Sequence, residues 1–308
     1  MFVMTARGQE SPRPLAPGVL TVIPADSQPS ETVTGPVAIP EIVEGMKDLK
    51  WTPQFAPQSE TILDRASQVI YRRPVWCLEF AFKPLRMIDV DIPQSSGKMQ
   101  RKRIWYMVYR VKNNGYDLNP SGAPDKWGHS VYSVEQVNFK DRRFLPHIVL
   151  HSFEFNKEYL DRVIPSAQRA IEERERMGVK LNNSVEISRV AIPLSDERAD
   201  RSVWGVAMWE DVDSRMDFFS INVGGLTNAF KLADPAPATA AASESADKDR
   251  RILTKTLQLN FWRPGDAVLE HENEFHFGIP IDVDPVAQDQ ILAKYGVKQR
   301  LDYVWVYR

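Results

Sequence analysis

Carboxylates gather in one short stretch of the sequence, at residues 210–217. Asp211, Asp213 and Asp217 offer the oxygen ligands that calcium prefers, and they would converge if the segment curled into a loop. The pattern departs from an EF-hand, because Arg215 stands where a ligand belongs and the expected glycine is missing. The same acids could form the carboxylate pair of a glycosidase, but sequence does not give their separation. We interpret the stretch as a strand connection in which Arg215 pairs with an acid, and an ion site as the alternative.

Tryptophan is the other residue type that suggests a ligand, because exposed indole rings can stack on sugars. The chain has 8 tryptophans, and most lie within alternating strand patterns, where core packing is the expected role. Trp127 lies in a loop rich in glycine and proline at residues 115–130, and Trp262 comes just before a turn. These two are the candidate ligand-binding residues.

The remaining reactive residues favour structural roles. Cys77 is the only cysteine, so no intrachain disulfide forms, and its apolar strand pattern predicts a buried, inert thiol. His271 and His276 are five residues apart, which does not match a zinc-binding helix. The sequence has no phosphate-binding loop, dinucleotide glycine motif or nucleophile elbow. We therefore predict no catalytic residue, cofactor or metal, and the sequence favours a protein without enzymatic activity.

The element that must position all of these residues is a predicted strand at residues 103–112. It is rich in aromatic and β-branched side chains, which favour strands. Because strand side chains alternate between faces, Trp105, Met107, Tyr109 and Val111 share one uncharged face. The opposite face becomes polar toward the end of the strand. The rest of the chain is expected to pack as further strands against this one.

Alternation predicts several further strands and one good helix. Residues 203–209 and 216–223 flank the acidic stretch and are interpreted as a hairpin. Residues 252–263 alternate most clearly, with the leucines and Phe261 facing inward and with Thr256, Gln258 and Asn260 facing outward. The other predicted strands lie at 76–82, 87–92, 131–139, 147–155, 185–192 and 301–307, and the helix lies at 161–177, where Pro165 suits the first turn.

Many short strands that do not alternate with helices predict a mainly β protein. We expect an antiparallel β-sandwich, immunoglobulin-like or jelly-roll-like, with one or two accessory helices. Residues 1–40 are rich in proline and are predicted to be a disordered tail. Residues 41–308 are then one β-rich domain, with short N-terminal helical segments and a mobile loop at 233–249.

Bulk properties restrict the partners and the location. A formal net charge of −2 gives no reason to expect a nucleic-acid partner. No apolar run approaches the ~20 residues that a membrane-spanning helix needs, so no transmembrane segment is predicted. The first residues lack the apolar region of a signal peptide. The location is therefore open between the cytoplasm and export from a start upstream.

Three stretches together resemble a known but uncharacterised group of bacterial, β-rich proteins that are usually predicted to be exported. They lie at residues 104–113, 203–229 and 255–266, and the likeness covers about residues 70–308. The resemblance implies an envelope or periplasmic location, from which this chain departs by lacking a recognisable signal peptide. It implies no catalytic activity.

Two functions follow as hypotheses. The first is a non-catalytic β-sandwich protein with a structural or protein–protein interaction role, for which the resemblance implies a location in the bacterial cell envelope. The second is a carbohydrate-active protein, either a sugar-binding module or a hydrolase with a carboxylate pair. The partner is accordingly expected to be a protein or a glycan.

Overall fold

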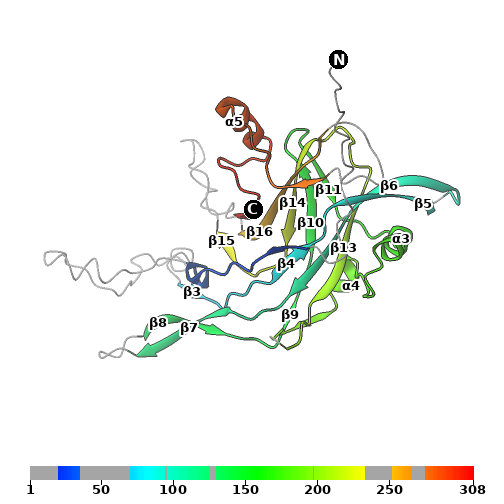
Figure 1. Ribbon diagram of the computed structural model, residues 1–308. Coiled ribbons are helices and arrows are strands. Elements are labelled where there is room, and N and C mark those ends of the chain that lie inside the picture. The colour runs from blue at the N-terminus through cyan, green and yellow to red at the C-terminus, as the bar shows by residue number, and fades with distance from the viewer. Residues whose placement is uncertain are drawn as a thin grey trace, which may run out of the picture.

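The computed structural model describes residues 20–34, 70–93, 96–124, 130–196, 198–232, 252–264 and 275–308. In this part of the chain, two large antiparallel sheets pack face to face, with few helices around them (Figure 1). The predicted mainly β, antiparallel sandwich is therefore confirmed. The predicted loop at 233–249, the helical segments before residue 70 and Trp127 lie outside the described residues.

The first large sheet is built around β6, which contains the predicted central strand. Its order is β1-β4-β6-β13, and β5 also pairs with β6. The strands are β1 (Thr21–Ile23), β4 (Glu79–Phe82), β5 (Arg86–Pro93), β6 (Met99–Lys112) and β13 (Val203–Glu210).

The second large sheet is built around β14 and β16. Its order is β11-β10-β14-β16-β15, and β17 and β18 also pair with β16. The strands are β10 (His147–Ser152), β11 (Lys157–Leu160), β14 (Phe218–Gly224), β15 (Phe230–Leu232), β16 (Ile252–Trp262), β17 (His276–Phe277) and β18 (Tyr303–Tyr307).

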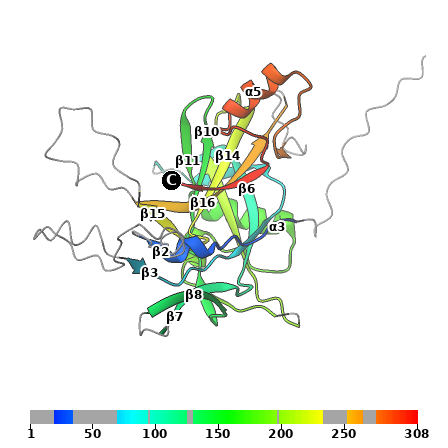
Figure 2. The same cartoon turned by 90° about the vertical axis from the view of Figure 1, so that its left-hand side faces the viewer.

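Smaller elements surround the two sheets. Three two-stranded sheets pair β2 (Val33–Thr34) with β3 (Tyr71–Arg72), β7 (Asp117–Pro124) with β8 (Ser130–Val137), and β9 (Asp141–Arg143) with β12 (Ala191–Pro193). The helices are the short 3-10 helix η1 (Pro29–Thr32), α3 (Pro165–Glu175), α4 (Ser184–Ile187) and α5 (Pro285–Ala293). Figure 2 shows β7 and β8 lying away from α5, at the opposite end of the molecule.

One hydrophobic core fills the space between the large sheets. Phe82 of the first sheet lies edge-on to Phe261 of the second, with ring centroids 5.8 Å apart. Trp105 is 2% exposed and meets Phe219 in the same way at 5.5 Å. The uncharged face predicted for residues 103–112 therefore points into this core.

The opposite face of β6 is covered by α3. Ile104, Tyr106 and Val108 are buried there against Ala167 and Ile171 of the helix. The sequence predicted the helix, but it did not predict that the helix covers the central strand. Because of this cover, β6 is buried on both faces over much of its length.

Asp161 connects this helical layer to the first sheet. Its carboxylate accepts hydrogen bonds from the Met208 backbone N–H, at 2.7 Å, and from the Ser184 hydroxyl. Burial raises the pKa of Asp161 to about 6, although these hydrogen bonds oppose the shift. The folded state thus holds this proton more tightly than the unfolded chain.

The Asp161→Asn variant tests that shift. Because the folded pKa is raised, the carboxyl's contribution to the free energy of unfolding is present below the ordinary pKa of about 4 and is lost as pH rises through about 6. Between pH 4 and pH 7, we expect the free energy of unfolding of the variant to rise relative to that of the parent by on the order of 2 kcal/mol. Urea unfolding of both proteins at each pH measures this gain. A difference that does not change with pH would contradict the raised pKa.

Two predictions about chain organisation need correction, the first of them in part. Residues 20–34 of the predicted disordered tail are ordered, because Ile23 enters the core and β1 pairs with β4. The predicted hairpin of residues 203–209 and 216–223 does not form. β13 pairs with β6 in the first sheet, whereas β14 pairs with β10 and β16 in the second. β6 and β16 are both longer than β13 and β14, so each of these two strands pairs with its observed partner over nearly its whole length. The acidic stretch therefore crosses from one sheet to the other.

Three local predictions also need correction. Thr256, Gln258 and Asn260 are buried rather than exposed, and Gln258 donates to the Tyr295 carbonyl in the segment that follows α5. Residues 117–124, predicted as loop, form β7. The strand predicted at 185–192 begins instead as α4, since the Asn183 side chain caps the backbone N–H groups of Val185 and Glu186.

Candidate functional site

The acidic stretch does not assemble an ion site. Asp211 pairs with Lys102 at 2.9 Å, and Asp213 pairs with Arg215 at 2.8 Å and with Lys157 at 3.3 Å. Hydrogen bonds from Arg215 hold the pKa of Asp213 well below its usual range. Asp217 lies just before β14, where its carbonyl accepts the Arg263 N–H. No group of three or more potential metal ligands occurs among the described residues.

The other predicted candidates are also placed by the structure. Trp262 is half-buried and stacks on His276, with ring centroids 4.3 Å apart, so this imidazole covers part of the indole. Cys77 is buried, and burial raises the pKa of its thiol to about 12, as expected of an unreactive cysteine.

None of the helices in the described part of the chain combines the length and hydropathy needed to cross a bilayer.

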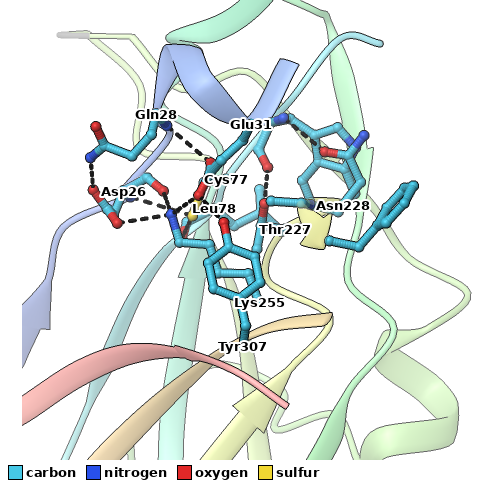
Figure 3. A network of polar contacts seen from close by, with 12 residues as sticks. Asp26, Gln28, Glu31, Cys77, Leu78, Thr227, Asn228, Lys255 and Tyr307 are labelled. Carbon is cyan, nitrogen blue, oxygen red and sulfur yellow. Dashed lines mark hydrogen bonds and ion pairs between the residues drawn. The ribbon is translucent and has the colours of Figure 1, made fainter. Parts of the chain in front are cut away.

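A buried polar network, which we call the Lys255 network, joins the segment that follows β1 to β16 and β18 (Figure 3). Lys255 extends from β16, and its side chain is 2% exposed. Its ammonium lies 2.6 Å from a Glu31 carboxylate oxygen and 2.8 Å from an Asp26 carboxylate oxygen. The Tyr307 hydroxyl donates to Glu31 at 2.5 Å. Segments from both ends of the described chain therefore meet at one lysine.

The charges of the Lys255 network stabilise one another. Burial disfavours the charged ammonium, but hydrogen bonds to Asp26 and Glu31 outweigh it and raise the pKa of Lys255. Burial and the hydrogen bond to Glu31 also raise the pKa of Tyr307. A lysine nucleophile or base needs a lowered pKa, so this lysine is suited to holding structure in place.

The network also fixes one wall of a cavity. The Asp26 carbonyl accepts from Lys255 at 2.5 Å, and the Asp26 N–H donates to the Cys77 sulfur at 3.4 Å. A cavity of about 630 Å³ lies on the other side of this wall. Its lining residues are Pro24, Ala25 and Asp26 on one side and residues 300–305 on the other. We call it the β18 groove, because a continuous stretch of the chain that includes the start of β18 forms its second wall.

The free edge of β18 faces away from β16. The Thr254 and Arg308 backbones exchange two hydrogen bonds, and the Asn260 N–H donates to the Asp302 carbonyl. Since antiparallel pairs alternate along a ladder, the even-numbered residues of β18 direct their backbone groups to β16. The N–H and carbonyl groups of Tyr303 and Trp305 therefore point outward, and they have no partner among the described residues.

The charged groups at the groove already have partners. Arg300 donates to the Ile279 carbonyl at 2.9 Å and lies 3.4 Å from Asp302. Asp302 accepts the Ile279 N–H at 3.1 Å. What the groove offers a ligand is thus a row of backbone donors and acceptors beside two aromatic residues. It does not offer a set of metal ligands or a nucleophile with a base.

The β18 groove was not predicted from the sequence. The strand at 301–307 was predicted, but its free edge depends on which strand pairs with β18. A faint signal was Lys255, a charged residue among inward-facing positions of the clearest strand.

No protein-family model, curated protein or solved structure matches this sequence.

Proposed function

We propose that this protein is a non-catalytic interaction protein that binds an extended segment of a partner polypeptide along β18. The observation that carries the proposal is the pair of outward-facing backbones, at Tyr303 and Trp305, beside the β18 groove. Extended peptides commonly bind by adding a strand to an exposed sheet edge, where main-chain hydrogen bonds supply affinity and side-chain pockets supply specificity. The resemblance to exported bacterial proteins makes the cell envelope the location that we propose for this binding.

The wall opposite β18 supports the same proposal. Asp26 is fixed by the Lys255 network, so the groove keeps its shape before a ligand arrives. A rigid groove limits the ordering that binding requires, and this favours affinity. The Asp26 side chain remains 34% exposed, and it offers a carboxylate to a donor on the incoming segment.

Tyr303→Pro tests strand addition directly. Proline removes the N–H that points into the groove and leaves the ladder to β16 intact. Linear dodecapeptides selected from a phage-displayed library on the parent protein serve as probes, and fluorescence anisotropy measures their affinity. We expect Tyr303→Pro to weaken binding about tenfold or more, since one hydrogen bond and close backbone approach are lost.

Two matched variants complete the experiment. Tyr303→Thr keeps the N–H and should retain most of the affinity. Val304→Pro removes an N–H that pairs with Gln258 and should lower the melting temperature, whereas Tyr303→Pro should not. Failure to select any peptide, or equal binding by the parent and Tyr303→Pro, would overturn the proposal.

Sugar binding is a second candidate, favoured by the aromatic residues Tyr303 and Trp305 in a cavity that also contains Asp26 and Arg300. A sugar would stack on the rings and would not need the backbone N–H. A glycan array therefore separates the two functions. Glycan binding that Tyr303→Thr and Tyr303→Pro weaken equally would favour the sugar, whereas peptide binding that only proline weakens favours strand addition.

A further inference from the structure

The β7–β8 ribbon has an open edge of a different kind from the β18 groove. β7 and β8 pair with each other along their whole length and join no other sheet. Seven of the eight residues of β8 are exposed, including Val131 at 57%, Tyr132 at 46% and Val134 at 38%. The ribbon projects away from the two large sheets (Figures 1 and 2).

The body of the protein contacts the ribbon through β7 and through the Tyr132 ring of β8. Leu118 of β7 exchanges two backbone hydrogen bonds with Val75. The Arg72 guanidinium lies 3.6 Å from the centre of the Tyr132 ring. Along its outer edge, β8 makes no backbone hydrogen bond to any described residue. A two-stranded ribbon is marginally stable in isolation, so an additional strand would stabilise it.

The sequence of β8 lacks the features that protect a free strand edge. Residues 130–137 contain no proline, lysine or glycine, and Glu135 is their only charge. The ribbon formed by β5 and the start of β6 provides a contrast within the same chain. It has Pro93 and charged pairs such as Asp89 with Arg103 along its length. The chain therefore protects one projecting ribbon and leaves the edge of the other open for pairing.

We propose that β8 pairs antiparallel with β8 of a second copy of this chain, across a two-fold axis at Val134. The two ribbons then form one continuous four-stranded sheet. In this register Val134 faces its own copy, and Val131 faces Val137 of the second copy. Glu135 faces Ser133 of the second copy, so the only charged residues of the two strands do not oppose each other. In this register like charges do not oppose each other and the valines face one another, so the edge is complementary to itself, as a two-fold interface requires.

A charge swap at the axis tests this pairing. Val134→Lys places two like charges directly opposite each other, and Val134→Glu does the same with the opposite sign. Sedimentation velocity of the full chain across a wide dilution series should show a dimer for the parent. Each variant alone should dissociate at a concentration at least about a hundredfold higher than the parent. An equimolar mixture of the two variants should recover the dimer, because lysine then faces glutamate.

Ile252→Lys is the matched control. Ile252 is a 62% exposed strand residue on β16, and this variant should remain dimeric. All variants should melt within a few degrees of the parent, since Val134 is outside the core. A parent that sediments as a monomer at every concentration would overturn the proposal. Dimers of Val134→Lys as stable as those of the parent, or variants that do not recover on mixing, would also do so.

Discussion

Trp105→Ala will lower the free energy of unfolding by about 3–5 kcal/mol, the range observed for removing a large aromatic side chain from a packed core. Trp105 lies between the two large sheets, with ring centroids 4.7 Å from Phe275 and 5.5 Å from Phe219. Alanine would leave a cavity that neither sheet can close without losing strand pairing. Because total stability is typically ~5–15 kcal/mol, the variant will be strongly destabilised or insoluble.

Urea unfolding followed by circular dichroism measures this loss. Val283→Ala serves as the control, because Val283 is 98% exposed and should change stability by no more than about 0.5 kcal/mol. If Trp105→Ala unfolded at the same urea concentration as the control, the placement of this residue in the core would be wrong.

Lys255→Met will strongly destabilise the protein, because it breaks a buried ion pair. It removes the cation and leaves the buried Glu31 carboxylate beside Asp26 with no cation in its place. Breaking a buried ion pair in this way typically costs about 3–5 kcal/mol. The thermal unfolding midpoint of Lys255→Met should therefore fall sharply, and the wall of the β18 groove should loosen with it.

A double-mutant cycle separates the interaction between Lys255 and Glu31 from the other effects of each substitution. Lys255→Met combined with Glu31→Leu should recover part of the lost stability, because an apolar pair can replace a buried ion pair at little cost. Lys294→Met is the matched control, since its partner Glu154 is 28% exposed and the pair should contribute at most about 1 kcal/mol. Equal effects at Lys255 and Lys294 would show that burial does not strengthen the Lys255 network.

The strands and the best helix were predictable because their signals are local. The alternation at Trp105, Met107 and Tyr109 is a property of adjacent residues, and it placed all three in the core. Pro165 marked the first turn of α3 in the same way. α5 was missed although Asp284 before Pro285 is a good helix start, since the Asp284 side chain caps the Val286 N–H.

The errors arose where a residue's surroundings are set by distant parts of the chain. Gln258 and Asn260 look like solvent-facing residues, but they are polar because they bond to each other, at 2.9 Å, and to the segment beyond α5. The Lys255 network could not be predicted for the same reason. Glu31 and Lys255 are separated by 224 residues, and no spacing rule connects them.

The Lys255 network also has a consequence for the order in which the protein folds during synthesis. The hydrogen bond between Tyr307 and Glu31 joins residues 276 positions apart. Such distant pairing makes folding slow, because the chain must close a long loop before the contact forms. During synthesis on the ribosome, Asp26 and Glu31 lack these partners until β16 and β18 have been made. The N-terminal segment would therefore need the protection of a chaperone for longer than the strands that follow it.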